Sequence, residues 1–188
     1  MRTKTLVTDR DVLIERYESP LSNPVRISTP SARHAKVGPA DLWQMKRDFQ
    51  IRFLMNAGLK PQHRLLDFGC GTLRGGLPLI QYLDIGNYTG IEIRQEALNE
   101  AKHELEESGL SIKKPRLECT NDLSALRLGT QFDAIWSFSV LIHLADAVLK
   151  EVLSFVSRHL DDRGVFYGPS GFIVGRGRDR RSRKRWRS

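Results

Sequence analysis

The fold is decided by residues 65–71, which read Leu65-Leu66-Asp67-Phe68-Gly69-Cys70-Gly71. A short apolar run of this kind is typical of a strand that is buried on both faces of a sheet. Gly69 and Gly71 can adopt positive φ angles, and because they lack Cβ atoms a ligand can lie against their backbone. The stretch therefore predicts a buried strand that opens into a ligand-binding turn before a helix over 75–83.

Strand and helix patterns alternate on both sides of this stretch. Further strand patterns lie at 88–93, 115–119, 132–137 and 165–167. Helical spacing of apolar residues occurs over 41–57, over 98–105 and over 148–160. Strands that alternate with helices predict an α/β fold with a doubly wound, mostly parallel sheet and right-handed crossovers.

The length of 188 residues fits one domain with flanking segments. Residues 1–40 have weak periodicity and several Pro and Ser residues, which predicts an N-terminal arm or lid before a domain over 41–171. Residues 172–188 contain eight Lys or Arg against one acid, so most of the net charge of +8 lies in this basic, disordered tail. The remainder of the chain is nearly neutral, and it gives no argument for a polyanion partner.

Two acids follow the predicted strands at informative places. Asp67 lies two residues before the first glycine of the turn, where a carboxylate would repel a pyrophosphate but suit an ammonium group. Glu92 ends the second strand, 23 residues after Gly69, close to the usual offset of an acid that binds ribose hydroxyls. A nucleoside that carries an amino-acid tail, such as S-adenosylmethionine, satisfies both acids.

With these blocks and Phe132-Asp133-Ala134-Ile135-Trp136-Ser137, the chain resembles the class I S-adenosylmethionine-dependent methyltransferases over about residues 60–168. The resemblance implies a Rossmann-like fold and methyl transfer. It implies that Asp67, Gly69 and Gly71, with Cys70 between them, surround the methionine part, and that Glu92 binds the ribose. It further implies that Asn121 or Asp122 approaches the adenine amino group and that the end of the fourth strand, Ser137 to Ser139, faces the cofactor near the transferred methyl group.

The chain departs from the family pattern at three places. The third glycine of the turn is replaced by Leu73, and Arg74, which is unusual there, is either a partner of the methionine carboxylate or a structural arginine. The fourth strand lacks the Asn/Asp-Pro-Pro-aromatic motif of enzymes that methylate amino groups of bases or glutamine. No strand pair is predicted after 165–167, so strands six and seven are expected to be missing and the sheet to expose an edge that promotes self-association.

Two further residues have a chemical and a structural interpretation. Cys70 could be a thiol nucleophile, but a small buried residue beside the cofactor is the favoured interpretation. His143 follows the fourth strand and is the candidate general base, although a packed histidine at a helix start is favoured. No metal-ligand spacing is present in the sequence.

The leading hypothesis is an S-adenosylmethionine-dependent methyltransferase with a small-molecule acceptor. The alternatives are an RNA methyltransferase that uses the basic tail and a catalytically incomplete cofactor-binding module. A nicotinamide-binding domain fits Glu92 but not Asp67. The absence of a charge-free run of about 18 residues and of an apolar leader, with only two cysteines, predicts a cytoplasmic protein without membrane association.

Overall fold

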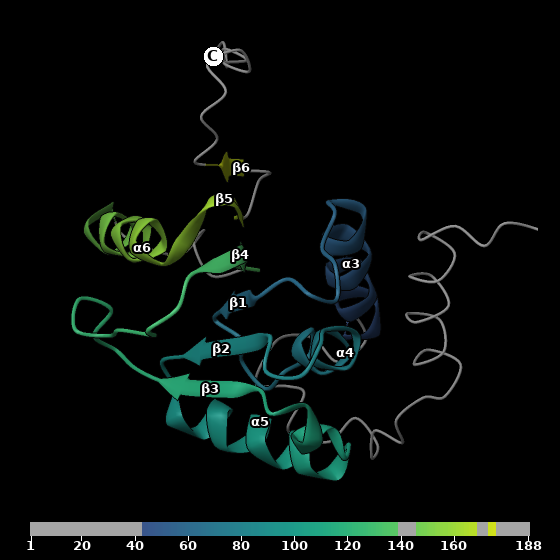
Figure 1. Ribbon diagram of the computed structural model, residues 1–188. Coiled ribbons are helices and arrows are strands. Elements are labelled where there is room, and N and C mark those ends of the chain that lie inside the picture. The colour runs from purple at the N-terminus through teal and green to yellow at the C-terminus, as the bar shows by residue number, and fades with distance from the viewer. Residues whose placement is uncertain (1–42, 139–145, 169–172, 176–188) are drawn as a thin grey trace, which may run out of the picture.

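A single twisted sheet organises the computed structural model, which describes residues 43–138, 146–168 and 173–175 (Figure 1). Its strand order is β3-β2-β1-β4-β5-β6. The strands are β1 Leu65–Phe68, β2 Tyr88–Glu92, β3 Arg116–Cys119, β4 Phe132–Trp136, β5 Leu160–Tyr167 and β6 Ile173–Gly175. The first five are parallel, which confirms the predicted doubly wound, mostly parallel α/β sheet.

The central strand β1 lies at the point where the strand order reverses. It pairs with β2 on one side and with β4 on the other, with Asp67 opposite both Gly90 and Trp136. Chain connections leave β1 and β4 in opposite directions from this point, so a crevice opens between them at their carboxyl ends. All four residues of β1 are buried, as expected for a strand that is covered on both faces.

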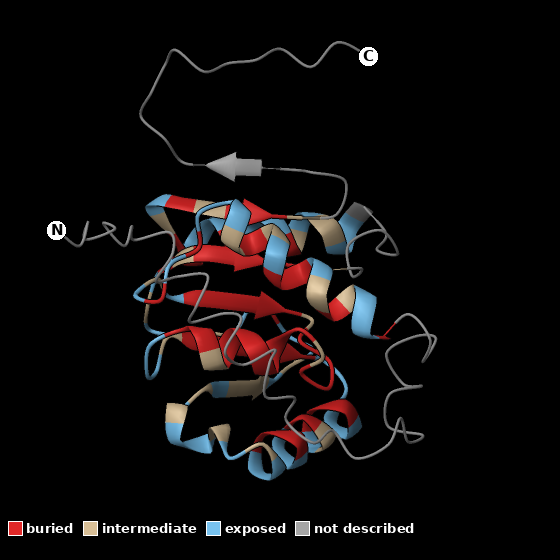
Figure 2. Cartoon of the chain, turned by 90° about the vertical axis from the view of Figure 1, so that its right-hand side faces the viewer, coloured by how far each residue is buried: buried red, intermediate tan, exposed pale blue. Residues whose placement is uncertain are grey.

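Helices cover both faces of the sheet (Figures 1 and 2). On one face lie α3 Trp43–Asn56, α4 Gly76–Tyr82 and α5 Gln95–Glu107, followed by the short 3-10 helix η2 Leu110–Lys113. Their buried side chains, among them Ile51, Leu79 and Leu98, pack with Leu65 of β1 in one core cluster. On the other face, α6 Asp146–His159 packs Val152 and Phe155 against Leu66, Ile135 and their neighbours in a second cluster.

The last helix and strand differ from the sequence prediction. The apolar spacing over 148–160 predicts a helix that includes Leu160, but α6 ends at His159 and β5 already begins at Leu160. Leu160 pairs with Phe132, while Ala134 pairs with Val165, so β5 contains a large bulge. Gly164 lies in this bulge, where a Cβ atom would be 2.7 Å from the carbonyl oxygen of Phe132.

A sixth strand, which the sequence analysis did not predict, pairs antiparallel with β5 through Ile173, Val174 and Gly175. The expectation of an uncovered β5 edge is therefore wrong for the part of β5 that faces β6. Three residues assigned to the basic tail belong to the sheet. The predicted arm over 1–40 and the remaining tail, 176–188, lie outside the described residues, and none of the described helices is long and apolar enough to cross a membrane.

Candidate functional site

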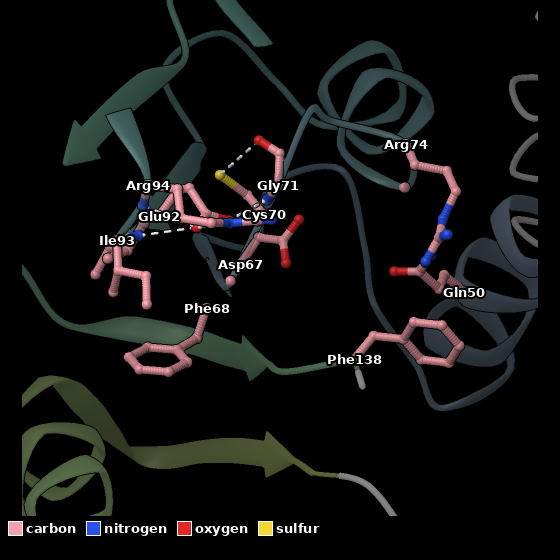
Figure 3. A pocket seen from close by; sticks show the side chains of 13 residues that line it. Gln50, Asp67, Phe68, Cys70, Gly71, Arg74, Glu92, Ile93, Arg94 and Phe138 are labelled. Carbon is pink, nitrogen blue, oxygen red and sulfur yellow. Dashed lines mark hydrogen bonds and ion pairs between the residues drawn. The ribbon is translucent and has the colours of Figure 1, made fainter. Parts of the chain in front are cut away.

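A pocket of about 310 Å³ lies at the carboxyl ends of β1 and β2, where the sequence places the ligand-binding turn (Figure 3). Its wall consists of the turn after β1, the end of β2, the helix α3 and Phe138 after β4. The lining residues include Gln50, Asp67, Gly69, Cys70, Gly71, Arg74, Glu92, Ile93, Arg94 and Phe138. Six of the predicted cofactor-binding residues are thus brought together in one cavity.

The turn after β1 has the backbone that its glycines allow. Gly69 has a φ of 79° and Gly71 a φ of 56°, both in the left-handed region. The amides of Gly69 and Cys70 donate hydrogen bonds to the carbonyl oxygen of Ile91, at 2.8 and 3.0 Å, which joins the turn to β2. Leu73, at the position of the absent third glycine, also has a positive φ of 63°, and its side chain is fully buried in the core.

Glu92 connects the end of β2 to this turn. Its Oε2 atom accepts a hydrogen bond of 3.0 Å from the amide of Gly71. Its Oε1 atom accepts bonds from the amides of Ile93 and Arg94, both at 3.0 Å, and from Nε of Arg94 at 3.2 Å. Because a carboxylate oxygen has about two strong acceptor positions, Oε1 is saturated and Oε2 retains capacity for one ligand hydroxyl.

Asp67 is a buried acid in the pocket wall. The hydroxyl of Tyr88 donates a hydrogen bond of 2.7 Å to its Oδ2 atom. The pKa of Asp67 is raised from 3.8 to about 6, mainly because burial removes the hydration of the charged carboxylate, and the nearby charge of Glu92 acts in the same direction. The Tyr88 hydrogen bond and the positive charge of Arg74 act in the opposite direction. A ligand ammonium in the pocket would supply the countercharge that this carboxylate requires.

The other side of the pocket carries Arg74, Gln50 and Phe138 (Figure 3). The guanidinium of Arg74 lies over the ring of Phe138, 5.8 Å from its centre. Partial burial lowers the pKa of Arg74, and the charge of Asp67 opposes that shift. Gln50 of α3 is buried and accepts a hydrogen bond of 3.2 Å from the indole of Trp136 on β4. Acidic and basic groups thus face one cavity from opposite sides.

Cys70 lines the pocket as a buried thiol. Burial raises its pKa well above the usual value, and the charges of Asp67 and Glu92 raise it further. The thiolate that a nucleophile needs is therefore disfavoured. Gly90 of β2 makes room for this side chain, because a Cβ atom there would lie 2.8 Å from the Cys70 sulfur. The geometry agrees with the interpretation as a small packing residue.

Four predicted residues are not in the pocket wall. Asn121 and Asp122 are exposed. The Asp122 carboxylate accepts hydrogen bonds from the hydroxyl of Ser124 and the amide of Ala125, and these bonds lower its pKa. Ser137 is buried, and its hydroxyl has no hydrogen-bond partner in the described part of the chain. His143 lies outside the described residues, so its role as a base stays a prediction.

Phe138, which lies in the segment 137–139 that was predicted to face the cofactor, lines the pocket. Gln50 and Ile93 also line it, but they were not predicted as site residues. Ile93 directly follows Glu92 and is 65% exposed, although it is a large apolar residue. An apolar residue directly after the acid at the end of a strand is a sequence signal that could have predicted Ile93 as a pocket residue. Gln50 has no such signal, because only the packing of α3 beside β4 brings it to the pocket.

A doubly wound sheet with a glycine turn after β1 and an acid at the end of β2 defines a Rossmann-like, nucleoside-binding class of protein. Within that class, a family model described as a methyltransferase domain matches residues 66–166. The match spans more than half of the chain, and the chain belongs to this family. The resemblance to class I S-adenosylmethionine-dependent methyltransferases is thereby confirmed.

Solved structures of methyltransferases have the same fold. A S-adenosylmethionine-dependent methyltransferase from Clostridium acetobutylicum ATCC 824 is 25% identical with a TM-score of 0.52, and the match covers 81% of this chain and 55% of that one. Magnesium protoporphyrin IX methyltransferase from Synechocystis PCC 6803, solved with bound S-adenosylhomocysteine, is 24% identical with a TM-score of 0.56, covering 69% and 57%. This chain spans about half the length of these structures. None of the curated proteins matches it.

Proposed function

We propose that this protein binds S-adenosylmethionine in the pocket after β1 and transfers its methyl group to a small-molecule acceptor. The proposal rests on one observation: Asp67 and Glu92 line the same cavity, which the glycine turn after β1 also lines. The charges match the zwitterionic tail of the cofactor, because Asp67 suits its ammonium and Arg74 its carboxylate. Glu92 suits a ribose hydroxyl through its Oε2 atom.

The methyl group is transferred from the cofactor's sulfonium, so the protein's task is to hold both partners in line and to exclude water. Asp67 and Arg74 would hold the two ends of the amino-acid tail, and Ile93 would provide an apolar surface beside the nucleoside. Phe138 follows β4 in the sequence, and its ring lies next to the guanidinium of Arg74. It would border the acceptor. His143, which follows in sequence, is the proposed base for an acceptor hydroxyl.

Calorimetry tests the proposal directly. S-adenosylhomocysteine should bind with a dissociation constant that rises at least about tenfold in D67N, because its ammonium loses a buried ionic partner. The control variant is D162N, which changes an exposed acid outside the pocket. Binding of NAD as tight as that of S-adenosylhomocysteine would refute the proposed cofactor.

Turnover distinguishes an enzyme from a cofactor-binding module. Purified protein incubated with S-adenosylmethionine and a panel of small hydroxyl and amine compounds should release S-adenosylhomocysteine with at least one of them. Tight binding without any release would favour the catalytically incomplete module instead.

A further inference from the structure

A second hollow, of about 770 Å³, lies at the other end of the sheet from the cofactor pocket. Three of its lining residues, Arg64, Gln131 and His159, directly precede β1, β4 and β5. The hollow is therefore at the amino ends of these strands, whereas the cofactor pocket is at the carboxyl ends of β1 and β2. Its volume is in the range of sites for small molecules, and the proposed methyl transfer makes no use of it.

The charged residues that line this hollow are all cations. Arg64, Arg127 and Arg158 contribute three guanidinium groups, and no carboxylate is among the lining residues. His159 adds no charge at neutral pH, because burial lowers its pKa and its Nε2 atom accepts a hydrogen bond from the amide of Leu128. The hollow therefore attracts an anion through its arginines alone.

Contacts to the backbone hold two of these arginines. Nη1 of Arg127 donates hydrogen bonds to the carbonyl oxygens of Ser124 and Leu126, in the segment between β3 and β4. Nη2 of Arg158, in the last turn of α6, donates to the carbonyl oxygen of Leu123 in the same segment. Because these contacts restrict both side chains, less conformational entropy is lost when the guanidinium groups bind an anion.

The same guanidinium groups keep donors for a ligand. Nη1 of Arg64 donates to the hydroxyl of Thr130, and Nη1 of Arg158 donates to the hydroxyl of Ser154. A guanidinium has five N–H donors, and within the described part of the chain each arginine of the hollow uses at most two of them. At least three donors of each arginine thus remain for the oxygens of an anion.

The surroundings of the hollow contain acids that its lining lacks. Oδ2 of Asp133 lies 3.7 Å from Nε of Arg64, and Asp161 and Asp162 follow at the start of β5. A long polyanion that extended past the hollow would meet these carboxylates, whereas a compact anion would contact only the arginines. The charge pattern therefore favours a small ligand over a nucleic acid.

We propose that this arginine hollow is a second binding site, which takes a small molecule that carries a diphosphate group. Guanidinium groups bind phosphate oxygens through pairs of parallel hydrogen bonds. Three of them match the several negative charges of a diphosphate better than the single charge of a carboxylate. Because the two sites lie at opposite ends of the strands, this ligand and the cofactor can be bound together.

The test is calorimetry of the full chain at neutral pH, with pyrophosphate as the probe, in the presence and absence of S-adenosylhomocysteine. Pyrophosphate should bind in a saturable, one-to-one manner that S-adenosylhomocysteine does not change. R127A and R64A should each raise its dissociation constant at least about threefold, because each removes one partly exposed ionic contact. The control R52A removes an exposed arginine of α3 outside the hollow and should leave the constant unchanged.

Several results would overturn this proposal. Absence of saturable binding, or equal dissociation constants in R127A and R52A, would show that the hollow is not the site. Displacement of pyrophosphate by S-adenosylhomocysteine would place the probe in the cofactor pocket instead. If S-adenosylhomocysteine itself does not bind, the proposed cofactor fails while the result for pyrophosphate stands.

The class of ligand is tested with competing anions. Citrate, a carboxylate anion of similar charge, should bind more weakly than pyrophosphate, and equal affinity would overturn the phosphate assignment. A greater effect of R127A on a single-stranded oligonucleotide, or on vesicles that contain phosphatidylserine, would overturn the small-molecule assignment. Thermal melting shows whether R127A folds, and R64A, whose guanidinium hydrogen-bonds only to the Thr130 side chain among the described residues, is the second variant.

Discussion

Asp67 is destabilising in the ligand-free protein because a buried carboxylate is charged at neutral pH. Its folded pKa of about 6 is above the unfolded value of 3.8, so folding takes up a proton between these values. The cost is absent below about pH 4 and reaches its full size above about pH 6. A shift of this size corresponds to about 2 to 3 kcal/mol.

D67N should therefore stabilise the ligand-free protein by about 1 to 3 kcal/mol at pH 8 and by about half as much at pH 5, because Asn carries no charge to bury. Urea unfolding at both pH values measures the difference. A stability gain that is equal at the two pH values would show that the Asp67 charge is not its cause.

Glu92 has two tasks that one substitution removes together. E92A deletes the partner of the Gly71 amide and the proposed acceptor of a ribose hydroxyl. We expect its dissociation constant for S-adenosylhomocysteine to rise by the equivalent of about 1 to 3 kcal/mol, as measured by calorimetry. E118A, an acid on β3 outside the pocket, is the control. An unchanged affinity in E92A would exclude Glu92 from the site.

At the scale of elements, the start of α4 is packed against the turn. A Cβ atom on Gly76 would lie 2.5 Å from Cδ2 of Leu73 and 2.6 Å from the hydroxyl of Tyr88, the group that holds Asp67. G76A should destabilise the protein by about 1 to 3 kcal/mol through overpacking and also weaken cofactor binding. Thermal melting and calorimetry measure the two effects.

G109A is the comparison for this prediction. Gly109 has a φ of 69° and open space around it, so alanine there costs backbone strain of about 1 to 2 kcal/mol without touching the pocket. G109A should lower the melting temperature but leave the affinity for S-adenosylhomocysteine unchanged. If both G76A and G109A lost affinity for S-adenosylhomocysteine, general destabilisation would explain the weaker binding, and the packing of Gly76 against the turn would not.

The sequence predicts the elements whose signals are local. β1, its glycine turn and the acid of β2 follow from apolar runs, glycine spacing and the offset of Glu92. The start of β5 does not, because the segment from Leu160 continues the helical spacing and only its pairing with Phe132 makes it a strand. For the same reason Gln50 was missed, because its place in the site depends on a contact between segments far apart in the sequence.

At the scale of the whole molecule, the two edges of the described sheet are protected in different ways. β3 carries Arg116 and Glu118, whose side chains pair at 2.6 Å and place charge along that edge. Charged side chains of this kind discourage pairing with another sheet. On the opposite side, β6 covers the apolar residues Val165, Phe166 and Tyr167 of β5.

Two truncations test the protection by β6. A chain that ends at Gly175 keeps β6, and one that ends at Gly168 removes it, while both lack the basic residues 176–188. The shorter chain should self-associate in light scattering and melt at a lower temperature, because β5 becomes an open edge. Two monomeric truncations with equal melting temperatures would show that β6 does not protect the sheet.

The hydrogen bonds from Gly71, Ile93 and Arg94 to Glu92 have a kinetic consequence. They join the turn to the end of β2 within the protein itself, so we expect the turn to keep its shape when the nucleoside enters. Association should then be a single step whose observed rate increases linearly with ligand concentration in stopped-flow fluorescence. A rate that reaches a plateau would indicate that a slow opening of this turn controls entry.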